Sequence, residues 1–234
     1  MTSSSSPTSG SAAADERGRA PRCLICKYPF AVTGRGGVQL DCMCASIPRV
    51  DTRTRIVILR HHTERDRSSN SGRLAHLALP NSALVDYGGR PDGSVGREIA
   101  TPLPSLDGAW LLFPEGEPLL AAPAVPPRQL VVLDATWAQA RRMYRKLAEL
   151  RGLPILRLPD LPMPVARLRS APAPGRVSTI EAIARALRIL EGDAVATPLE
   201  ALFTAAVDRV LATGRLAGRG ANALVTDAPE IETG

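Results

Sequence analysis

The chain has 234 residues, enough for one large domain with a substantial core or for a domain with attachments. Its 29 Lys and Arg against 23 Asp and Glu give a net charge of +6, and most of the cations are arginines, which suit forked contacts with phosphates. Aromatic residues make up only 3% of the sequence, which argues against a single-strand binder built on stacking platforms. No apolar run approaches the roughly 20 residues that span a bilayer, and the start lacks the apolar middle of a secretory signal. We therefore expect a cytoplasmic protein with no membrane partner.

Short apolar runs alternate with helical patterns along the middle of the chain. Residues 1–20, rich in Ser, Ala and Gly, and residues 215–234 predict flexible tails, whereas 21–50 and 51–214 predict a small cysteine-containing segment and a larger α/β domain. The expected helices cover residues 72–79, 136–150, 178–191 and 198–213. The expected strands are Ile56–Leu59, Leu84–Val85, Trp110–Phe113, Leu130–Leu133 and Ile155–Leu158. This alternation predicts an α/β fold with a largely parallel sheet and flanking helices.

Two of the expected helices carry start signals. Ser178 and Glu181 have the spacing of a capping box, in which each side chain binds the other residue's backbone N–H, and Gly192 is expected to end that helix. The same spacing recurs at Thr197 and Glu200, where Pro198 would take the first helical position.

All four cysteines lie early, as Cys23-Leu-Ile-Cys26 and Cys42-Met-Cys44. Two close pairs separated by a hairpin-sized gap resemble a zinc knuckle, because four thiolates can then surround one ion tetrahedrally. A C-x-C second pair is a weaker match than C-x-x-C, so free thiols remain the alternative, while disulfides lack the support of a secreted composition. Four sulfur ligands leave no open position, and the expected zinc is structural.

The stretch from Leu130 to Lys146 combines an apolar strand, an acid and a basic helix. Asp134 follows the strand directly, and ligands of parallel α/β sheets collect at the carboxyl ends of strands. Asp134 can equally be a helix N-cap, and one residue can do both. Trp137 falls on one side of the following helix, and four cations fall largely on the other: Arg141, Arg142, Arg145 and Lys146. That basic side is either a nucleic-acid contact or a solvated surface.

Three further groups of residues are candidates for binding or catalysis. His61 and Glu64 follow a strand and can act as an acid/base pair, position a polar ligand, or be ordinary turn residues. Asn70 precedes a helix and can belong to an anion-binding loop or serve as an N-cap. Arg167 and Arg169 can clamp a carboxylate or phosphate, or simply be solvated. G-x-G-x-x-G, Walker A, G-x-S-x-G and H-E-x-x-H motifs are all absent from the sequence, so the activities tied to them lack their central motif.

Taken together in chain order, these groups resemble the DTW-domain family of tRNA-uridine aminocarboxypropyltransferases. Asp134-Ala135-Thr136-Trp137 matches its D-x-T-W motif. Ala135 stands where the family often has Gly, and Ser71 where Thr is common. The remaining matching blocks are the two cysteine pairs, His61 to Glu64, Asn70-Ser71-Gly72, Phe113-Pro114, Arg167-Leu168-Arg169 and Ser178-Thr179-Ile180-Glu181-Ala182.

The resemblance implies a SPOUT-like, knotted α/β sheet that holds S-adenosylmethionine. It also implies a reaction, in which the 3-amino-3-carboxypropyl group moves to N3 of a tRNA uridine and methylthioadenosine is released. Two alternatives remain: a SPOUT-like RNA methyltransferase that uses the same donor, and a non-catalytic, zinc-containing RNA-binding protein.

Within this resemblance Asp134 is expected to be the general base that takes the N3 proton. The residues expected to bind the donor are Pro114, Thr136, Trp137, Arg169, Ser178, Thr179 and Glu181. Unsatisfied N–H groups at the helix start near Ser178 are expected to suit the donor's carboxylate. The residues expected to bind tRNA are His61, Glu64, Asn70, Arg141, Arg142, Arg145 and Lys146.

Overall fold

The computed structural model describes residues 21–30, 32–34, 37, 39–67, 70–89, 95–99, 102–160 and 177–213. The two expected tails lie outside these described residues, and so do Arg167 and Arg169. Within the described ranges, no helix is long and apolar enough to cross a membrane.

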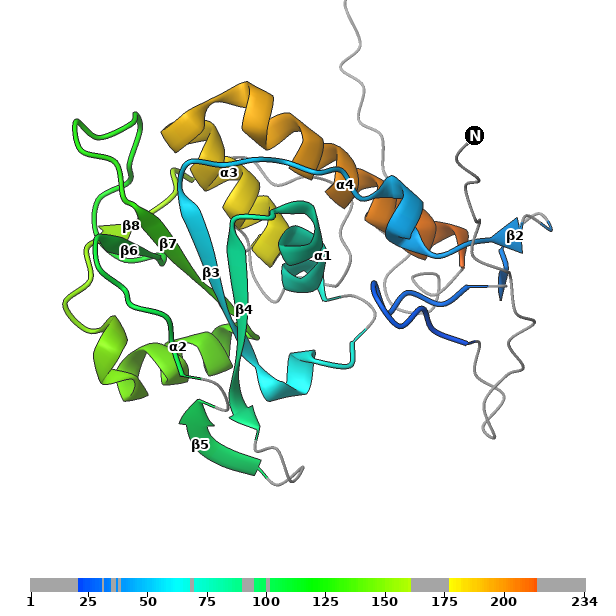
Figure 1. Cartoon of the computed structure of the whole chain (residues 1–234), viewed down its shortest axis with the longest axis horizontal. Helices are drawn as coiled ribbons and strands as arrows, with labels where there is room; N and C mark the ends of the chain where they lie inside the picture. The colour runs from blue at the N-terminus through cyan, green and yellow to red at the C-terminus, as the bar shows by residue number, and fades with distance from the viewer. Residues whose placement is uncertain are drawn as a thin grey trace, which may run out of the picture.

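A six-stranded sheet with the order β5-β4-β3-β7-β6-β8 forms the centre of the protein (Figure 1). Five of its strands are mutually parallel, and β5 pairs antiparallel with β4 at one edge. The strands are β3 (Arg55–His61), β4 (Ser82–Gly89), β5 (Val95–Ile99), β6 (Ala109–Leu112), β7 (Gln129–Asp134) and β8 (Ile155–Leu156). The predicted parallel α/β architecture is confirmed, and all five predicted strands are present.

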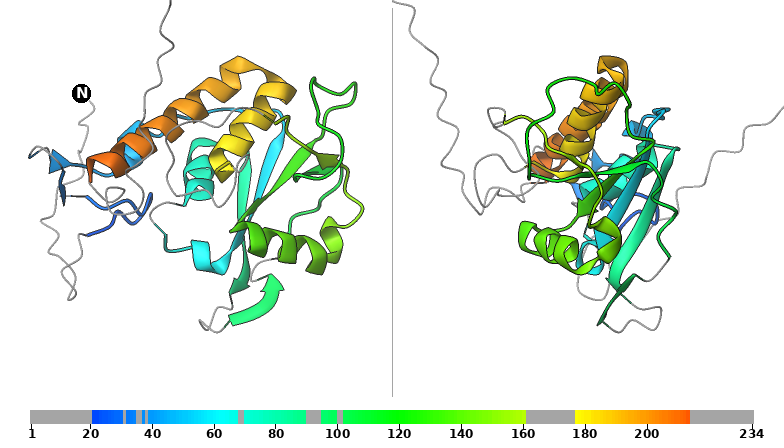
Figure 2. Two further views of the ribbon diagram at one scale, coloured as in Figure 1. Left: turned by 180° about the vertical axis from the view of Figure 1, so that it is seen from behind. Right: turned by 90° about the vertical axis from the view of Figure 1, so that its left-hand side faces the viewer.

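Both faces of the central strands are covered, which explains why β3 and β7 are apolar without alternation. On one face, Ile56, Ile58, Leu130 and Val132 pack in one core cluster with α1 (Ser71–Ala78), α3 (Thr179–Glu191) and α4 (Asp193–Ala212). On the other face, Val57 and Val131 pack with α2 (Trp137–Lys146) and the short 3-10 helix η4 (Ala148–Leu150). Figures 1 and 2 show α1, α3 and α4 grouped together and α2 apart from them.

Three details differ from the sequence-based expectations. The expected start of the last helix at Pro198 is wrong, because α4 begins at Asp193 and Pro198 lies inside it. Gly192 ends α3 as predicted, and α4 follows it immediately. The expected helix 136–150 is interrupted at Leu147, whose extended backbone separates α2 from η4. Strand β5 was not predicted, since its Val-Gly-Arg-Glu-Ile sequence has no clear apolar run.

The cysteine-containing segment packs at the far end of α4 (Figures 1 and 2). It holds the two-stranded ribbon of β1 (Val32–Thr33) and β2 (Gln39–Leu40) and the 3-10 helix η2 (Met43–Ser46). Cys26, Tyr28 and Met43 belong to the same buried cluster as the helices α3 and α4. Arg209 of α4 also donates a hydrogen bond to the Pro29 carbonyl. The segment is therefore built onto the main core.

Candidate active site

The neighbouring strands β3 and β7 connect to helices on opposite faces of the sheet. Strand β3 leads through the 3-10 helix η3 (His62–Glu64) into α1 on one face of the sheet, whereas β7 leads into α2 on the other face. Loops that diverge in this way open a crevice at the carboxyl ends of parallel strands, where ligands of such sheets bind. Asp134 is the last residue of β7 and lies at this point.

The Asp134 carboxylate is buried between the starts of two helices, with 4% of the residue exposed. Asn70, the N-cap of α1, donates a hydrogen bond to Oδ2 through its side-chain amide. Thr179, the first residue of α3, donates to Oδ1 at 2.7 Å. The alternative that Asp134 caps the helix after it is wrong, because Thr136 is the N-cap of α2 and forms a capping box with Gln139.

The start of α1 fits against this carboxylate only because residue 72 is glycine. A Cβ atom at Gly72 would lie 2.5 Å from Cγ of Asp134 and 2.6 Å from Oδ2. The close approach explains the Asn70-Ser71-Gly72 sequence: Asn70 supplies both the cap and the amide donor, and Gly72 leaves space for the acid.

Burial raises the pKa of Asp134, and the nearby Glu64 carboxylate acts in the same direction. The hydrogen bonds from Asn70 and Thr179 and the positive charge of Arg60 oppose this shift. Arg60 is the residue paired with Asp134 across β3 and β7, and it forms an ion pair at 2.7 Å with Asp86 on β4. Three neighbouring strands thus carry an acid, a guanidinium and an acid at paired positions, Asp134, Arg60 and Asp86.

A cavity of about 150 Å³ opens beside Asp134, between the ends of β6 and β7 and the starts of α2 and α3. Four of the seven residues expected to bind the donor line it: Pro114, Trp137, Ser178 and Thr179. The other lining residues are Leu112, Phe113, Val132, Leu133, Ala135, Ala140, Arg157, Leu158, Pro159, Asp160, Val177, Ala182 and Arg185. Asp134 itself does not line this cavity, but Thr179, which does, donates a hydrogen bond to its carboxylate.

The start of α3 offers less to a carboxylate than the sequence predicted. The N–H of Ser178 donates to Glu181, the N–H of Thr179 donates to Ser71, and the N–H of Glu181 donates to Ser178. These donors are therefore already used by the protein, and Glu181 is a capping residue that does not line the cavity. Thr136 likewise does not line it.

Two arginines that were not predicted as site residues also line the cavity. Arg157 follows β8 directly, so the rule that drew attention to Asp134, a polar residue at a strand's carboxyl end, also applies to it. Arg185 lies on α3 with Thr179 and Ala182, at a helical spacing of three and six residues. Arg169, which was expected in this role, lies outside the described residues.

His61 and Glu64 lie at the end of β3 and in η3 and do not line the described cavity. His61 interacts through Nδ1 with the hydroxyl of Thr63 at 2.9 Å, and burial, followed by the charge of His62, lowers its pKa. Glu64 is buried, with an ion-pair distance of 3.5 Å to Arg67. The two side chains are therefore part of a local network; their contact with RNA stays a prediction, as does that of Asn70.

The predicted basic surface on α2 is exposed in the structure. It consists of Arg141, Arg142, Arg145 and Lys146. The first residue of the same helix, Trp137, lines the cavity. Gln139 of the same helix donates a hydrogen bond to Thr63, which ties α2 to the end of β3.

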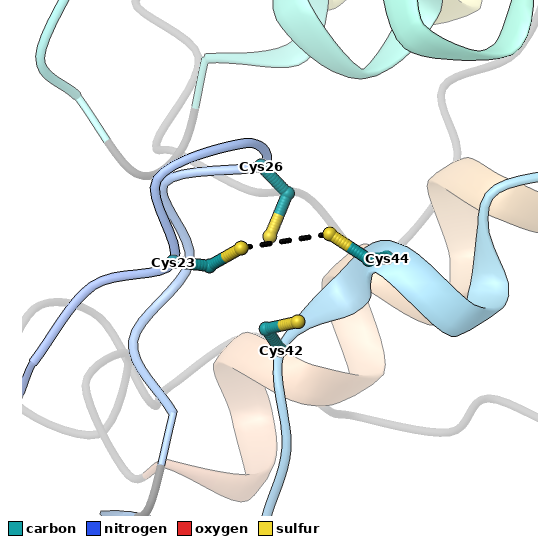
Figure 3. A group of neighbouring side chains, drawn as sticks. All are labelled: Cys23, Cys26, Cys42 and Cys44. Carbon is teal, nitrogen blue, oxygen red and sulfur yellow. Dashed lines mark hydrogen bonds between the residues drawn. The ribbon is translucent and has the colours of Figure 1, made fainter. Parts of the chain in front are cut away.

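The four cysteines converge as the sequence predicted (Figure 3). Their Sγ atoms all lie within 4.8 Å of one another, and those of Cys23 and Cys44 are 3.5 Å apart, with no disulfide. Zn–S bonds of about 2.3 Å place the sulfurs of a tetrahedral site about 3.8 Å apart, so the donor set fits zinc. Burial raises the pKa of Cys44, and its thiol neighbours raise it further, so a cation is needed to hold all four as thiolates.

The turn that carries the first pair requires an unusual backbone. Lys27, directly after Cys26, has φ of +61°, and its N–H donates to the Cys23 carbonyl. This brings the two sulfurs to the same side of the turn.

Fold and site together define an α/β protein with a cavity at the carboxyl ends of its parallel strands and a separate four-cysteine cluster. The DTW domain matches residues 21–211, and the chain belongs to that family. It is 29% identical over 185 residues to tRNA-uridine aminocarboxypropyltransferase 2 of Drosophila melanogaster, covering 76% of this chain and 70% of the fly protein. Proteins of the same name from Macaca fascicularis and Mus musculus are 26% and 27% identical over 198 residues, which is 79% of this chain and 63% of theirs. No solved structure gives a significant match.

Proposed function

We propose that this protein is an S-adenosylmethionine-dependent tRNA-uridine aminocarboxypropyltransferase. The family membership and the printed names of the relatives support this function. The observation that carries it is the cavity beside Asp134, whose wall contains the D-x-T-W tryptophan and the start of the Ser178–Ala182 block. The knotted, SPOUT-like topology stays a prediction, because residues 161–176, between β8 and α3, lie outside the described residues.

The cavity residues fit such a donor. Phe113 and Trp137 offer aromatic surface to an adenine ring, and polar and charged side chains line the rest of a mainly apolar wall. When bound, the donor supplies the electrophilic carbon next to its sulfonium, and breaking that C–S bond releases methylthioadenosine. The new bond forms from N3 of the uridine, which attacks poorly while it carries its proton.

We propose that Asp134 is the base and that Thr179 transfers the proton to it. Because Asp134 is buried behind the wall, the hydroxyl of Thr179 is the group that contacts the uridine. This hydroxyl donates to Oδ1 of Asp134, so its lone pairs are available to the N3 proton. As the C–N bond forms, that proton passes to Thr179 and the hydroxyl proton passes to Asp134. Burial favours the neutral acid that results.

Thr179→Val removes the connection with little change in volume, and Thr179→Ser keeps it. We expect Thr179→Val and Asp134→Asn to lower kcat by about 100- to 10,000-fold, the usual contribution of acid–base catalysis, and Thr179→Ser to stay close to wild type. Equal kcat values for the Val and Ser variants would contradict the proton transfer.

We further propose that tRNA lies across the basic surface of α2, and that the four cysteines hold a structural zinc. Lys and Arg contacts with phosphates release counterions, so tRNA affinity should fall steeply as salt rises. An affinity that is independent of salt would exclude this surface as the main contact.

Product analysis tests the function. The purified full chain is incubated with unmodified tRNA and labelled S-adenosylmethionine, and the nucleosides are then digested and weighed. We expect aminocarboxypropyluridine together with methylthioadenosine. Methylated uridine together with S-adenosylhomocysteine would instead show a methyltransferase, and tRNA binding that Asp134→Asn leaves unchanged, without donor binding, would show a non-catalytic RNA-binding protein.

A further inference from the structure

Arg185 is a half-buried cation in the cavity wall that the proposed chemistry does not use. It lies on α3, and Thr179, Ala182 and Arg185 form one stripe along the cavity side of that helix. The guanidinium of Arg185 donates a hydrogen bond to the Pro159 carbonyl, so it lies beside the segment that follows β8, which also lines the cavity.

The charges in the cavity are unevenly compensated. Arg157 donates to the Gly116 carbonyl at 3.0 Å and forms an ion pair with Asp160 at 2.8 Å, so a carboxylate balances its charge. Arg185 donates to the carbonyl of Pro159, a neutral group, and no carboxylate among the described residues forms an ion pair with it. One positive charge in the wall of a largely apolar cavity therefore has no described counter-charge.

Three backbone N–H groups at the start of α3 are not free to bind an anion. The N–H groups of Ser178, Thr179 and Glu181 already have protein acceptors, as described above. These three donors are therefore not available to a ligand carboxylate, whereas a guanidinium provides charged, paired N–H groups for it.

We infer that Arg185 binds the carboxylate of the donor's amino-acid end and fixes which end of the donor faces Asp134. This inference rests on the proposed function, since it assigns the orientation of that donor. With the carboxylate at Arg185, the aminocarboxypropyl carbon lies on the α3 side of the cavity, near Thr179. Arg185 is thereby a specificity-determining residue, because a ligand without that carboxylate gains nothing from it.

Binding measurements with three nucleosides test the inference without requiring turnover. S-adenosylmethionine and S-adenosylhomocysteine both carry the carboxylate, and methylthioadenosine lacks it. We expect Arg185→Gln to weaken binding of the first two by roughly 10- to 100-fold in calorimetry, as for loss of a charged hydrogen bond, and to leave methylthioadenosine unchanged. Arg185→Lys should fall between, because an ammonium keeps the charge but not the fork.

Arg188→Gln is the matched control. It removes the same charge from the same helix, but Arg188 is exposed, is ion-paired with Asp193 and Glu200, and does not line this cavity. It should leave all three affinities unchanged. Equal weakening of all three nucleosides by Arg185→Gln, or no weakening, would overturn the inference while leaving the proposed function intact. Failure of the wild-type protein to bind any of the three would overturn the function itself.

Discussion

At Gly72 a single hydrogen atom separates the backbone of α1 from the carboxylate of Asp134. Alanine in place of glycine in a helix is normally stabilising by about 1 kcal/mol, because the unfolded chain has less freedom to lose. Here the added methyl group would overlap the carboxylate, with 2.5 Å to Cγ. The contact therefore reverses the ordinary sign of the substitution.

We expect Gly72→Ala to lower the free energy of unfolding by about 1–3 kcal/mol, the usual cost of overpacking, and to displace Asp134. Urea denaturation measures the first effect and kcat the second. The double variant Gly72→Ala/Asp134→Ala provides the control, since removing the carboxylate should recover much of the loss. Strictly additive stability changes would show that the two residues do not meet.

The pKa of Asp134 also makes a prediction about pH. Because burial raises this pKa above the ordinary value of about 3.9, kcat should fall on the acid side at a pH higher than an ordinary aspartate would give. The folded pKa lies above the unfolded one, so the contribution of Asp134 to stability is fully present below about pH 3.9 and is lost as pH rises through the folded value. A kcat profile that is flat down to pH 4 would contradict the assignment.

Residues at strand ends and helix starts were the predictable part of the site. Pro114, Trp137, Ser178 and Thr179, which were expected to bind the donor, line the cavity, and their contact with the donor stays a prediction. Arg185 was not predicted, because it lies in the middle of a helix and only three-dimensional packing shows that this face borders a cavity. The role of Asn70 as a partner of Asp134 was missed for a similar reason, since the two residues are 64 positions apart.

At the scale of the elements, the junction of α3 and α4 depends on one backbone conformation. Gly192 has φ of +98° and ψ of −178°, a region that glycine alone adopts readily. A Cβ atom there would meet nothing within 4 Å, so any cost of substitution comes from the backbone. The two helices pack on the same core as the sheet, which makes the junction important for α3 and hence for Thr179.

Gly192→Ala should lower the free energy of unfolding by about 1–3 kcal/mol, the cost of such a backbone conformation for other residues. Gly192→Asn distinguishes the cause: asparagine tolerates the ordinary left-handed region, but not this ψ value, and should not restore stability. Denaturant midpoints for the two variants provide the measurement. Wild-type stability in either variant would show that the junction can relax.

Apolar periodicity predicted the long helices and strands, and it failed where tertiary contacts decide the local structure. The apolar runs of β3 and β7 and the stripe of α3 were recognisable because they are buried. Strand β5 pairs only at an edge and needs no apolar pattern, so it was missed. The capping-box spacing at Thr197 was misleading, because Gly192 starts α4 earlier and the packing of Ala196 and Leu199 maintains the helix through Pro198.

For the molecule as a whole, the four-cysteine centre and the catalytic domain share one core. Cys26 and Met43 are buried in the cluster that includes Leu199 and Phe203 of α4. Binding of a metal to the folded state is then also stabilisation of α4 and the sheet behind it.

We expect about one zinc per chain by elemental analysis, and removal of it by a chelator should lower the melting temperature of the whole protein in a single transition. Cys42→Ser should have the same effect without chelator. A separate low-temperature transition with an unchanged main one would show that the cysteine segment folds independently of the core. An unchanged melting curve after metal removal would show that the centre contributes no stability.

The placement of Trp137 gives the protein an intrinsic optical probe. The sequence contains two tryptophans, and one of them forms part of the cavity wall while the other, Trp110, lies on β6 and packs against the helical core. In a Trp110→Phe background, all remaining indole emission comes from the wall of this cavity. Binding of a nucleoside in the cavity could then be followed by fluorescence in real time, with no label attached to protein, donor or RNA.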